Sequence, residues 1–311
     1  MGPGDASRHL GLDLGATNLK WAVLERDGDR WEILDKGQLP TDAVDGGDAV
    51  IGRMADTAEH ARTRWPGILS VGVGVPGLFD AARGVTTFLP NLPPDWADRP
   101  VAAPLADRLG LPVRLINDAR AFGLAELRLG AGRSCDTMVG ITLGSGIGGV
   151  VVVQREVHFG HDGTGGEVGH QTLLPDGPLC TCGNYGCLEA LTKADAVAAA
   201  CGTDTAEAGV LAAQDGDDQA LDGLAEIGHW LGIGIANLIV VLNPDRVVLG
   251  GGIANAGELL LDPIREEVSR RVRVTNLDAV EIVNADLGTW AGAVGAGVHG
   301  AVLVADAVPT R

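Results

Sequence analysis

Three cysteines and one histidine lie close together in the stretch GHQTLLPDGPLCTCGNYGCLEA, Gly169 to Ala190. Thiolates and imidazoles are the usual protein ligands of zinc, and a Cys3His set is typical of a closed tetrahedral structural site. The four candidate ligands are His170, Cys180, Cys182 and Cys187. Because this set fills all four positions, it leaves none for an activated water. The spacing therefore predicts a zinc ion that orders a loop rather than one that performs chemistry.

Two glutamates flank the cysteine-rich stretch, Glu167 in GGEVGH and Glu189 in GCLEA. An isolated glutamate is ordinarily a solvated surface charge. On a loop fixed by a metal, however, carboxylates are well placed to accept hydrogen bonds from vicinal hydroxyls. His170 can bind the metal through one ring nitrogen and donate from the other. The stretch is therefore a candidate site for a polyhydroxylated substrate.

Two glycine-rich turns are candidates for binding phosphate, LDLGATN and TLGSGIGG. The second matches G-x-G-x-x-G, but a dinucleotide site needs a helix after the turn. Here the β-branched run VVVVQ follows and favours a strand. A hairpin turn can still present backbone N–H groups to a phosphate, although a single instance is equally a plain turn. The presence of two such turns predicts a triphosphate site, in which Asp13 holds Mg²⁺ directly or through water. The residues expected to form this site are Asp13, Gly15, Thr17, Asn18, Thr142, Gly144, Ser145 and Gly146.

Two further motifs fit the same chemistry. VVLGGG places Gly250, Gly251 and Gly252 where a strand meets a helix, so a flat nucleoside can lie close to the backbone. Asn117 and Asp118 stand at a strand-to-helix junction, where a helix N-cap is the simplest interpretation. The functional alternative makes Asp118 a general base and Asn117 a ligand of a substrate hydroxyl. Phosphoryl transfer needs mainly positioning, a metal and one acceptor for the alcohol proton.

The elements that carry these motifs follow a duplicated α/β pattern. A strand, glycine turn and strand at residues 10–24 precede a third strand and a helix at about 49–64, and the same opening recurs at Thr137. This predicts two lobes with a cleft between them. The expected small lobe is residues 1–117, with a C-terminal helix at about 290–311 packing back on it. The expected large lobe is residues 118–289, with the zinc loop at 167–189.

Composition narrows the class of protein. The 311 residues are 46% hydrophobic, 4% aromatic and carry a formal net charge of -18. Such a charge repels phosphate backbones and anionic lipid, so we expect no nucleic-acid and no membrane partner. The N-terminus lacks the pattern of a signal peptide, and the apolar segment WAGAVGAGVHGAVLVADAV is interrupted by glycines and charges, which favours a buried helix. We therefore expect a reducing cytoplasm, where cysteines bind metals more often than they form disulfides.

Taken together, the motifs resemble the ROK family (repressor, open reading frame, kinase), especially its bacterial glucokinase branch. The resemblance runs from about Leu10 to Gly297 and is strongest in GEVGHQTLLPDGPLCTCGNYGCLEA. It implies the two-lobed actin, hexokinase and Hsp70 ATPase fold, with duplicated ribonuclease-H-like domains. It also implies an ATP- and Mg²⁺-dependent hexose kinase that phosphorylates the 6-hydroxyl, with structural Zn²⁺ and a dimeric or tetrameric assembly. The implied base is Asp118, and the implied sugar contacts are Asn91, Asn117, Asp118, Glu167, His170 and Glu189.

Some residues depart from the family pattern and leave the substrate open. Gly15-Ala16-Thr17-Asn18 stands where Gly-Gly-Thr-Lys is usual, and Arg120 replaces a common Asn. Glucose is the first expectation, and the alternatives are glucosamine, kanosamine, N-acetylglucosamine and N-acetylmannosamine. The alternative of another class is a non-catalytic sugar sensor or repressor. A repressor of this family carries a helix-turn-helix before the first strand, and only nine residues precede Leu10.

Overall fold

The computed structural model describes residues 6–89 and 92–306 and divides into two compact units. The first unit is Met1–Leu129 with Thr289–Arg311, and the second is Gly130–Gly288. Each unit contains one five-stranded mixed sheet. The division falls after Leu129 rather than at Asn117, because the helix that begins at Asp118 packs against the C-terminal helix of the first unit.

The sheet of the first unit has the strand order β3-β2-β1-β4-β8. Its strands are β1 (Ser7–Leu14), β2 (Asn18–Asp27), β3 (Arg30–Pro40), β4 (Ile68–Val75) and β8 (Val113–Asn117). Strands β1, β2 and β3 form an antiparallel meander, while β4 and β8 continue from β1 in parallel. Because the carboxyl ends of parallel strands meet at one edge, Asp13 near the end of β1 and Asn117 at the end of β8 come to the same edge.

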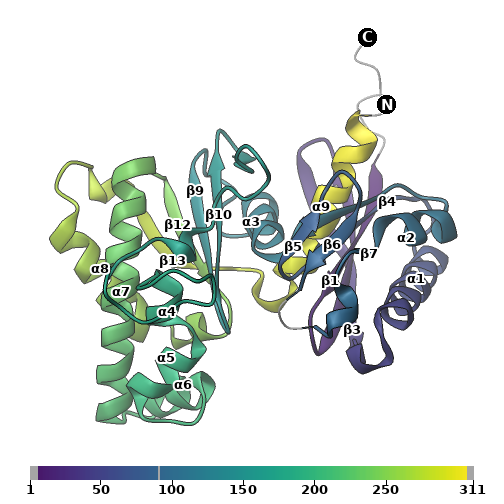
Figure 1. Cartoon of the computed structure of the whole chain (residues 1–311). Coiled ribbons are helices and arrows are strands. Elements are labelled where there is room, and N and C mark those ends of the chain that lie inside the picture. Colours follow the sequence, from purple (N-terminus) through teal and green to yellow (C-terminus); the bar gives the residue numbers. More distant parts are fainter. Residues whose placement is uncertain (1–5, 90–91, 307–311) are drawn as a thin grey trace. The chain divides into compact units, whose positions relative to one another are not determined.

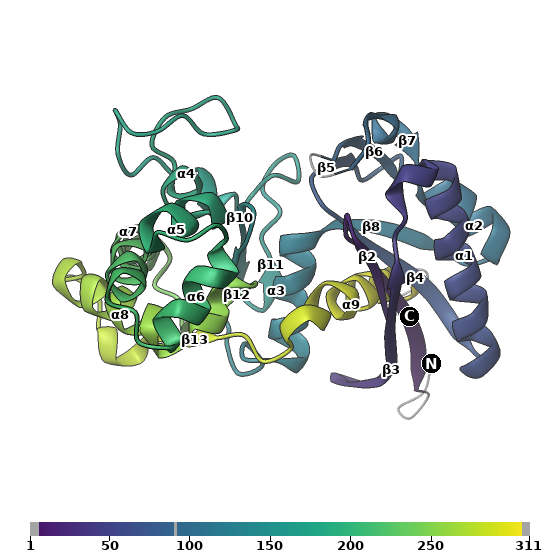
Figure 2. The same ribbon diagram turned by 90° about the horizontal axis from the view of Figure 1, so that it is seen from below.

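Helices cover both faces of this sheet (Figures 1 and 2). Helices α1 (Gly47–Arg64) and α2 (Ala102–Leu109) pack on one face, where alternate β1 and β4 side chains form a continuous apolar core. Helix α9 (Ala291–Asp306) lies on the opposite face against β1 and β4, and α3 (Asp118–Leu129) packs along it. The apolar C-terminal segment is thus a packed helix of the first unit.

A small antiparallel sheet in the first unit was not expected from the sequence. It consists of β5 (Leu78–Asp80), β6 (Val85–Phe88) and β7 (Arg99–Pro100), with a short 3-10 helix at Pro94–Trp96 between β6 and β7. Another short 3-10 helix, Ala43–Asp45, precedes α1. The strands are only two to four residues long. Strands this short carry too little alternation to be recognised in a sequence, and buried Trp96 and Val85 stabilise them by packing.

The sheet of the second unit has the order β11-β10-β9-β12-β13. Its strands are β9 (Met138–Leu143), β10 (Ile147–Val153), β11 (Glu156–Val157), β12 (Arg246–Gly250) and β13 (Glu281–Asn284). The helices are α4 (Leu188–Thr192), α5 (Ala194–Cys201), α6 (Ala206–Gln214), α7 (Asp218–Leu242) and α8 (Glu258–Arg271), with short 3-10 helices at Val168–His170, Ile253–Ala256 and Leu277–Ala279. Their apolar faces and the β9 and β12 side chains form one core. A further 3-10 helix, Gly288–Trp290, spans the boundary between the two units.

Helix α7 is the central helix of this core. It is long and apolar enough to cross a membrane by length and composition, but half of its most apolar window is buried in the protein. Leu224, Leu231 and Ile235 on its inner face are fully buried against the sheet and α8. Its apolar character is therefore explained by packing.

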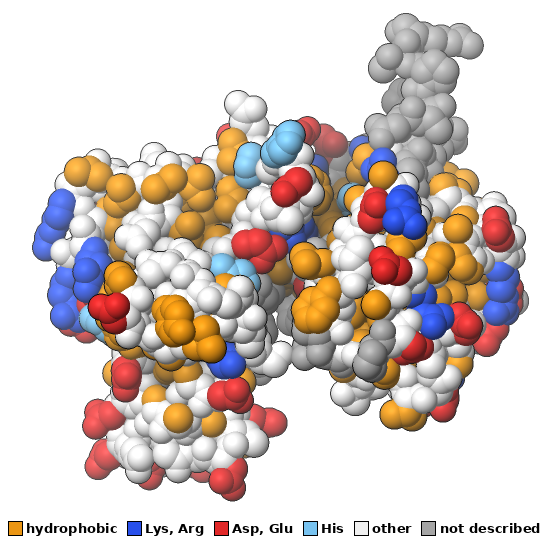
Figure 3. All heavy atoms as spheres, in the orientation of Figure 1, with side chains coloured by type: hydrophobic (Ala, Val, Ile, Leu, Met, Phe, Trp, Pro, Cys, Tyr) orange, Lys and Arg blue, Asp and Glu red, His pale blue; other side chains and the backbone are white. Residues whose placement is uncertain are grey.

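Acidic side chains gather around α6 and the start of α7, at the lower end of the second unit in Figure 3. Asp204, Glu207, Asp215, Asp218 and Asp222 are all exposed there. This accounts for a visible part of the net charge of -18, and such a surface favours solubility and repels polyanions.

Candidate active site and metal centre

The first glycine turn joins β1 to β2 and is held from both ends. The Gly15 N–H donates to the Asn18 carbonyl at 3.1 Å. The Thr41 hydroxyl donates to the Gly15 carbonyl at 2.7 Å, and the Thr41 N–H donates to the Thr17 carbonyl at 2.9 Å. Thr41 is buried and was not among the expected site residues. No local motif marks it, because only the pairing of Asn18 with Pro40 across β2 and β3 brings it to the turn.

Asp13 lies at the end of β1 in an environment that disfavours its charge. Burial and the nearby Asp118 carboxylate raise the pKa of Asp13 to about 7, against a smaller lowering effect of Lys20. The carboxylate also lies against the first turn of α9, where a Cβ on Gly292 would be 2.5 Å from Asp13 Oδ2. Gly292 was not anticipated either, because α9 is remote from β1 in sequence. Because a nearby positive charge favours the ionised form of a carboxylate, a cation beside Asp13 would lower this pKa.

Asn117 and Asp118 occupy the junction of β8 and α3. Asn117 Oδ1 accepts hydrogen bonds from the N–H groups of Ala119 and Arg120 at 3.0 and 3.3 Å, and its amide donates to the Gly77 carbonyl at 3.4 Å. Asn117 is therefore the helix cap that its position suggested. Asp118 is exposed and accepts a hydrogen bond from the Ala119 N–H at 2.8 Å. Arg120, at the position that departs from the family pattern, is buried.

The second glycine turn joins β9 to β10 and lies beside the third glycine motif. The Gly144 N–H donates to the Gly146 carbonyl at 3.0 Å, much as Gly15 bonds to Asn18 in the first turn. Strand β12 pairs in parallel with β9, so that Gly250 is opposite Thr142. The structure thus brings together the residues expected to bind phosphate and those expected to bind a nucleoside: Thr142, Gly144, Ser145, Gly146, Gly250, Gly251 and Gly252.

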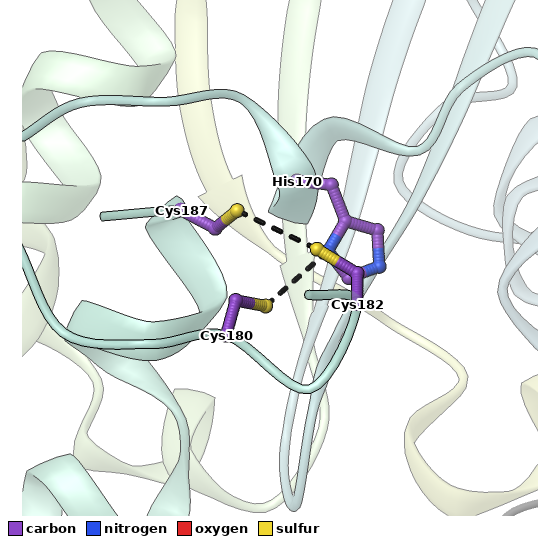
Figure 4. A group of neighbouring side chains, drawn as sticks. All are labelled: His170, Cys180, Cys182 and Cys187. Atoms are coloured by element: carbon purple, nitrogen blue, oxygen red, sulfur yellow. Dashed lines mark hydrogen bonds between the residues drawn. The ribbon is translucent and has the colours of Figure 1, made fainter. Parts of the chain in front are cut away.

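The four candidate metal ligands form one cluster (Figure 4). Their ligand atoms all lie within 4.8 Å of one another. Cys180 Sγ is 3.7 Å from His170 Nδ1, and Cys182 Sγ is 3.8 Å from Cys187 Sγ. A tetrahedral zinc site with Zn–S bonds of about 2.3 Å has sulfur–sulfur edges of about 3.8 Å. The arrangement is therefore compatible with a structural zinc ion.

The local chain explains how these side chains converge. His170 ends the 3-10 helix Val168–His170, and Cys187 is the N-cap residue of α4. Between them, the Cys180 N–H donates to the Asn184 carbonyl at 2.7 Å and forms a tight turn. Burial raises the pKa of Cys187 to about 12 and also raises that of Cys180. Buried thiols of this kind become thiolates when a cation compensates their charge.

The two flanking glutamates have different surroundings. Glu167 is exposed and is the N-cap residue of the 3-10 helix that ends at His170. Glu189 is half-buried in α4, where its carboxylate accepts hydrogen bonds from the Ile147 N–H at 2.9 Å and the Thr181 hydroxyl at 3.0 Å. Asn91, the remaining candidate sugar contact, lies outside the described residues.

Two units that each open with a strand, a glycine turn and a strand define an α/β protein of the actin-like ATPase fold. The model of the ROK family matches residues 9–302, and the chain belongs to this family. Its fold and motifs place it with the family's glucokinase-type sugar kinases.

Individual relatives support this placement. The chain is 37% identical to a glucokinase of Thermotoga maritima, over 92% of this chain and 95% of that protein. The crystal structure of a ROK hexokinase from Thermus thermophilus matches with a TM-score of 0.85 and 36% identity, over 96% of this chain and 99% of that one. A ROK glucokinase from Streptomyces griseus, in complex with glucose and AMPPNP, matches with a TM-score of 0.79 and 30% identity, over 95% and 100% of the two chains. Xylose repressors are also similar, over a smaller share of their own length.

Proposed function

We propose that this protein transfers the γ-phosphoryl group of ATP to the 6-hydroxyl of glucose. The observation that carries the proposal is the proximity of Asp118 to Asp13 at one edge of the sheet, next to a glycine turn held by Thr41. The Asp118 carboxylate is exposed to solvent, while the more buried Asp13 carboxylate is suited to binding a cation. The similarity to a glucokinase in complex with glucose and AMPPNP supports both substrates.

In this assignment Asp118 is the general base. It accepts the proton of the 6-hydroxyl as the sugar oxygen attacks the γ-phosphorus and the bond to the β-phosphate oxygen breaks, giving ADP and glucose 6-phosphate. Little covalent chemistry is required of the protein, so one positioned acceptor suffices. Asn117 caps α3 and thereby fixes the direction of Asp118.

The nucleotide is assigned to the glycine motifs. Backbone N–H groups of the two turns donate to phosphate oxygens, and the Gly250–Gly252 segment lies along the nucleoside. Mg²⁺ is assigned to Asp13, since Mg²⁺ in such enzymes is held by one or two carboxylates together with substrate phosphates. When bound, the cation neutralises developing negative charge on the phosphates.

The sugar is assigned to Asn91, Asn117, Glu167, His170 and Glu189, and the metal of the Cys3His cluster to Zn²⁺. Zinc in a closed site orders the loop and leaves the chemistry to the carboxylates. We further propose a homodimer or homotetramer that works in the cytoplasm, as the family resemblance implies. An amino or N-acetylated hexose is the second candidate substrate, because Arg120, which is buried two residues after Asp118, stands where the family commonly has Asn.

A sugar panel tests the proposal. We expect ADP release with MgATP to be fastest on glucose among glucose, mannose, glucosamine, kanosamine and the N-acetylated hexosamines. A higher rate on an aminated sugar would reassign the substrate. Binding of sugars with no turnover on any of them would favour the non-catalytic sensor instead.

A further inference from the structure

The carboxylate of Glu189 connects two parts of the second unit that are far apart in sequence. Its Oε2 accepts the Ile147 N–H at 2.9 Å, directly after the second glycine turn. Its Oε1 accepts the Thr181 hydroxyl at 3.0 Å and lies 3.6 Å from Cys180 Sγ. One side chain therefore links the turn to the cysteine loop. A carboxylate has about four acceptor sites, so these contacts leave room for a substrate hydroxyl as well.

The glycine turn is shaped around this carboxylate. A Cβ on Gly146 would lie 2.7 Å from Glu189 Oε2, so a side chain at Gly146 would displace it. On the other side of the turn, the Ala194 N–H donates to the Gly144 carbonyl at 2.8 Å. Glu189 lies in α4, and Ala194 is the first residue of α5. The segment that directly follows the last cysteine of the cluster thus holds the turn at two points.

Thr181 is the link to the metal cluster. It stands between Cys180 and Cys182, two of the four candidate ligands. A metal that binds both neighbours restrains the backbone of the residue between them, and thereby the position from which the Thr181 hydroxyl donates to Glu189. The contacts then run without interruption from the cluster through Thr181 and Glu189 to Ile147.

We propose that Glu189 is a positioning residue that transmits the order of the Cys3His loop to the second glycine turn. The cluster then governs the affinity for nucleotide as well as for sugar. This inference rests on the proposed function in one respect, the assignment of the turn to nucleotide phosphate. The physical coupling between loop and turn does not depend on it.

Two matched threonine variants test the coupling. Thr181→Val removes the hydroxyl that bonds to Glu189, and Thr172→Val removes a hydroxyl of the same loop that instead accepts a hydrogen bond from Asn184 at 2.8 Å. Both threonines are exposed, so neither change disturbs a core. We expect Thr181→Val to increase hydrogen exchange at the Ile147 amide and to raise KM for MgATP about tenfold, as for loss of a hydrogen bond to a charged group. Thr172→Val is expected to leave both unchanged.

The KM values separate this role from a purely sugar-binding one. Thr181→Val should raise KM for ATP more than KM for glucose, because the Glu189 carboxylate itself remains. A change in glucose KM alone, with Ile147 exchange as in the wild type, would overturn the proposal. Equal effects of the two threonine variants would overturn it too, since they would show general loosening of the loop.

Zinc removal provides the second measurement. Chelation should increase Ile147 exchange in the wild type and add little in Glu189→Gln, where the link is already weakened. If chelation raises exchange equally in both proteins, Glu189 is not the link. Should the protein show no kinase activity at all, the exchange data still decide the coupling, and only the assignment of the turn to ATP fails.

Discussion

Asp13→Asn is expected to stabilise the metal-free protein at neutral and alkaline pH while it abolishes kinase activity. The carboxylate is half-buried at the end of β1, beside Asp118 and against the first turn of α9. Burial and the neighbouring charge raise its pKa from 3.8 to about 7. A group whose folded-state pKa is raised contributes stability below its unfolded-state pKa, and that contribution is lost as pH rises through the folded-state value.

The magnitude follows from the shift. A difference of roughly 3 pKa units, from 3.8 to about 7, lowers the free energy of unfolding of the wild type by at most about 4 kcal/mol at pH 8. At pH 4.5 the same effect lowers the free energy of unfolding by only about 1 kcal/mol. The stability gained by Asp13→Asn over the wild type should therefore grow between pH 4.5 and pH 8. His9 and His299, whose pKa values burial lowers to about 4, add their own pH dependence, but they cancel when both proteins are compared at one pH.

The assay is urea unfolding of both proteins without Mg²⁺ at a series of pH values, with kinase activity measured in parallel. Asp118→Asn serves as a comparison, because it relieves only the charge–charge part of the Asp13 shift and should stabilise less. A difference in unfolding free energy between Asp13→Asn and wild type that does not change with pH would show that the pKa of Asp13 is not raised.

Three further changes probe the same machinery. Gly292→Ala places a Cβ 2.5 Å from Asp13 Oδ2 and should raise the Mg²⁺ concentration for half-maximal activity at least about tenfold. An unchanged Mg²⁺ dependence of the activity would contradict this. Thr41→Val removes the bond to the Gly15 carbonyl and should raise KM for ATP about fivefold with glucose KM unchanged. Removal of zinc by a chelator should lower Tm and raise glucose KM together; if both stay constant, the cluster does not order the sugar loop.

Local patterns in the sequence were enough to predict the main strands, the two glycine turns and the cluster of His170 with the three cysteines. Each depends on residues that are near one another in the chain. The bond from Glu189 to Ile147, the reach of Thr41 to the first turn and the approach of Gly292 to Asp13 depend on sheet register and helix docking. These contacts belong to the tertiary structure, and no short sequence motif indicates them.

The division between the units shows the same limit. A strand-to-helix junction at Asn117 is the natural boundary in the sequence, because the first mixed sheet ends there. Helix α3 nonetheless belongs with the first unit, since its contacts with α9 join segments from opposite ends of the chain. Only the packing of the final helix reveals which unit α3 joins.

Phosphorus NMR of the wild type and Asp118→Asn with glucose and MgATP tests most directly whether Asp118 is the general base. The wild type is expected to form ADP and glucose 6-phosphate in equal amounts, whereas Asp118→Asn is expected to bind glucose but to form neither product at a comparable rate. Formation of glucose 6-phosphate by Asp118→Asn at a rate near that of the wild type would contradict the assignment of Asp118 as the base.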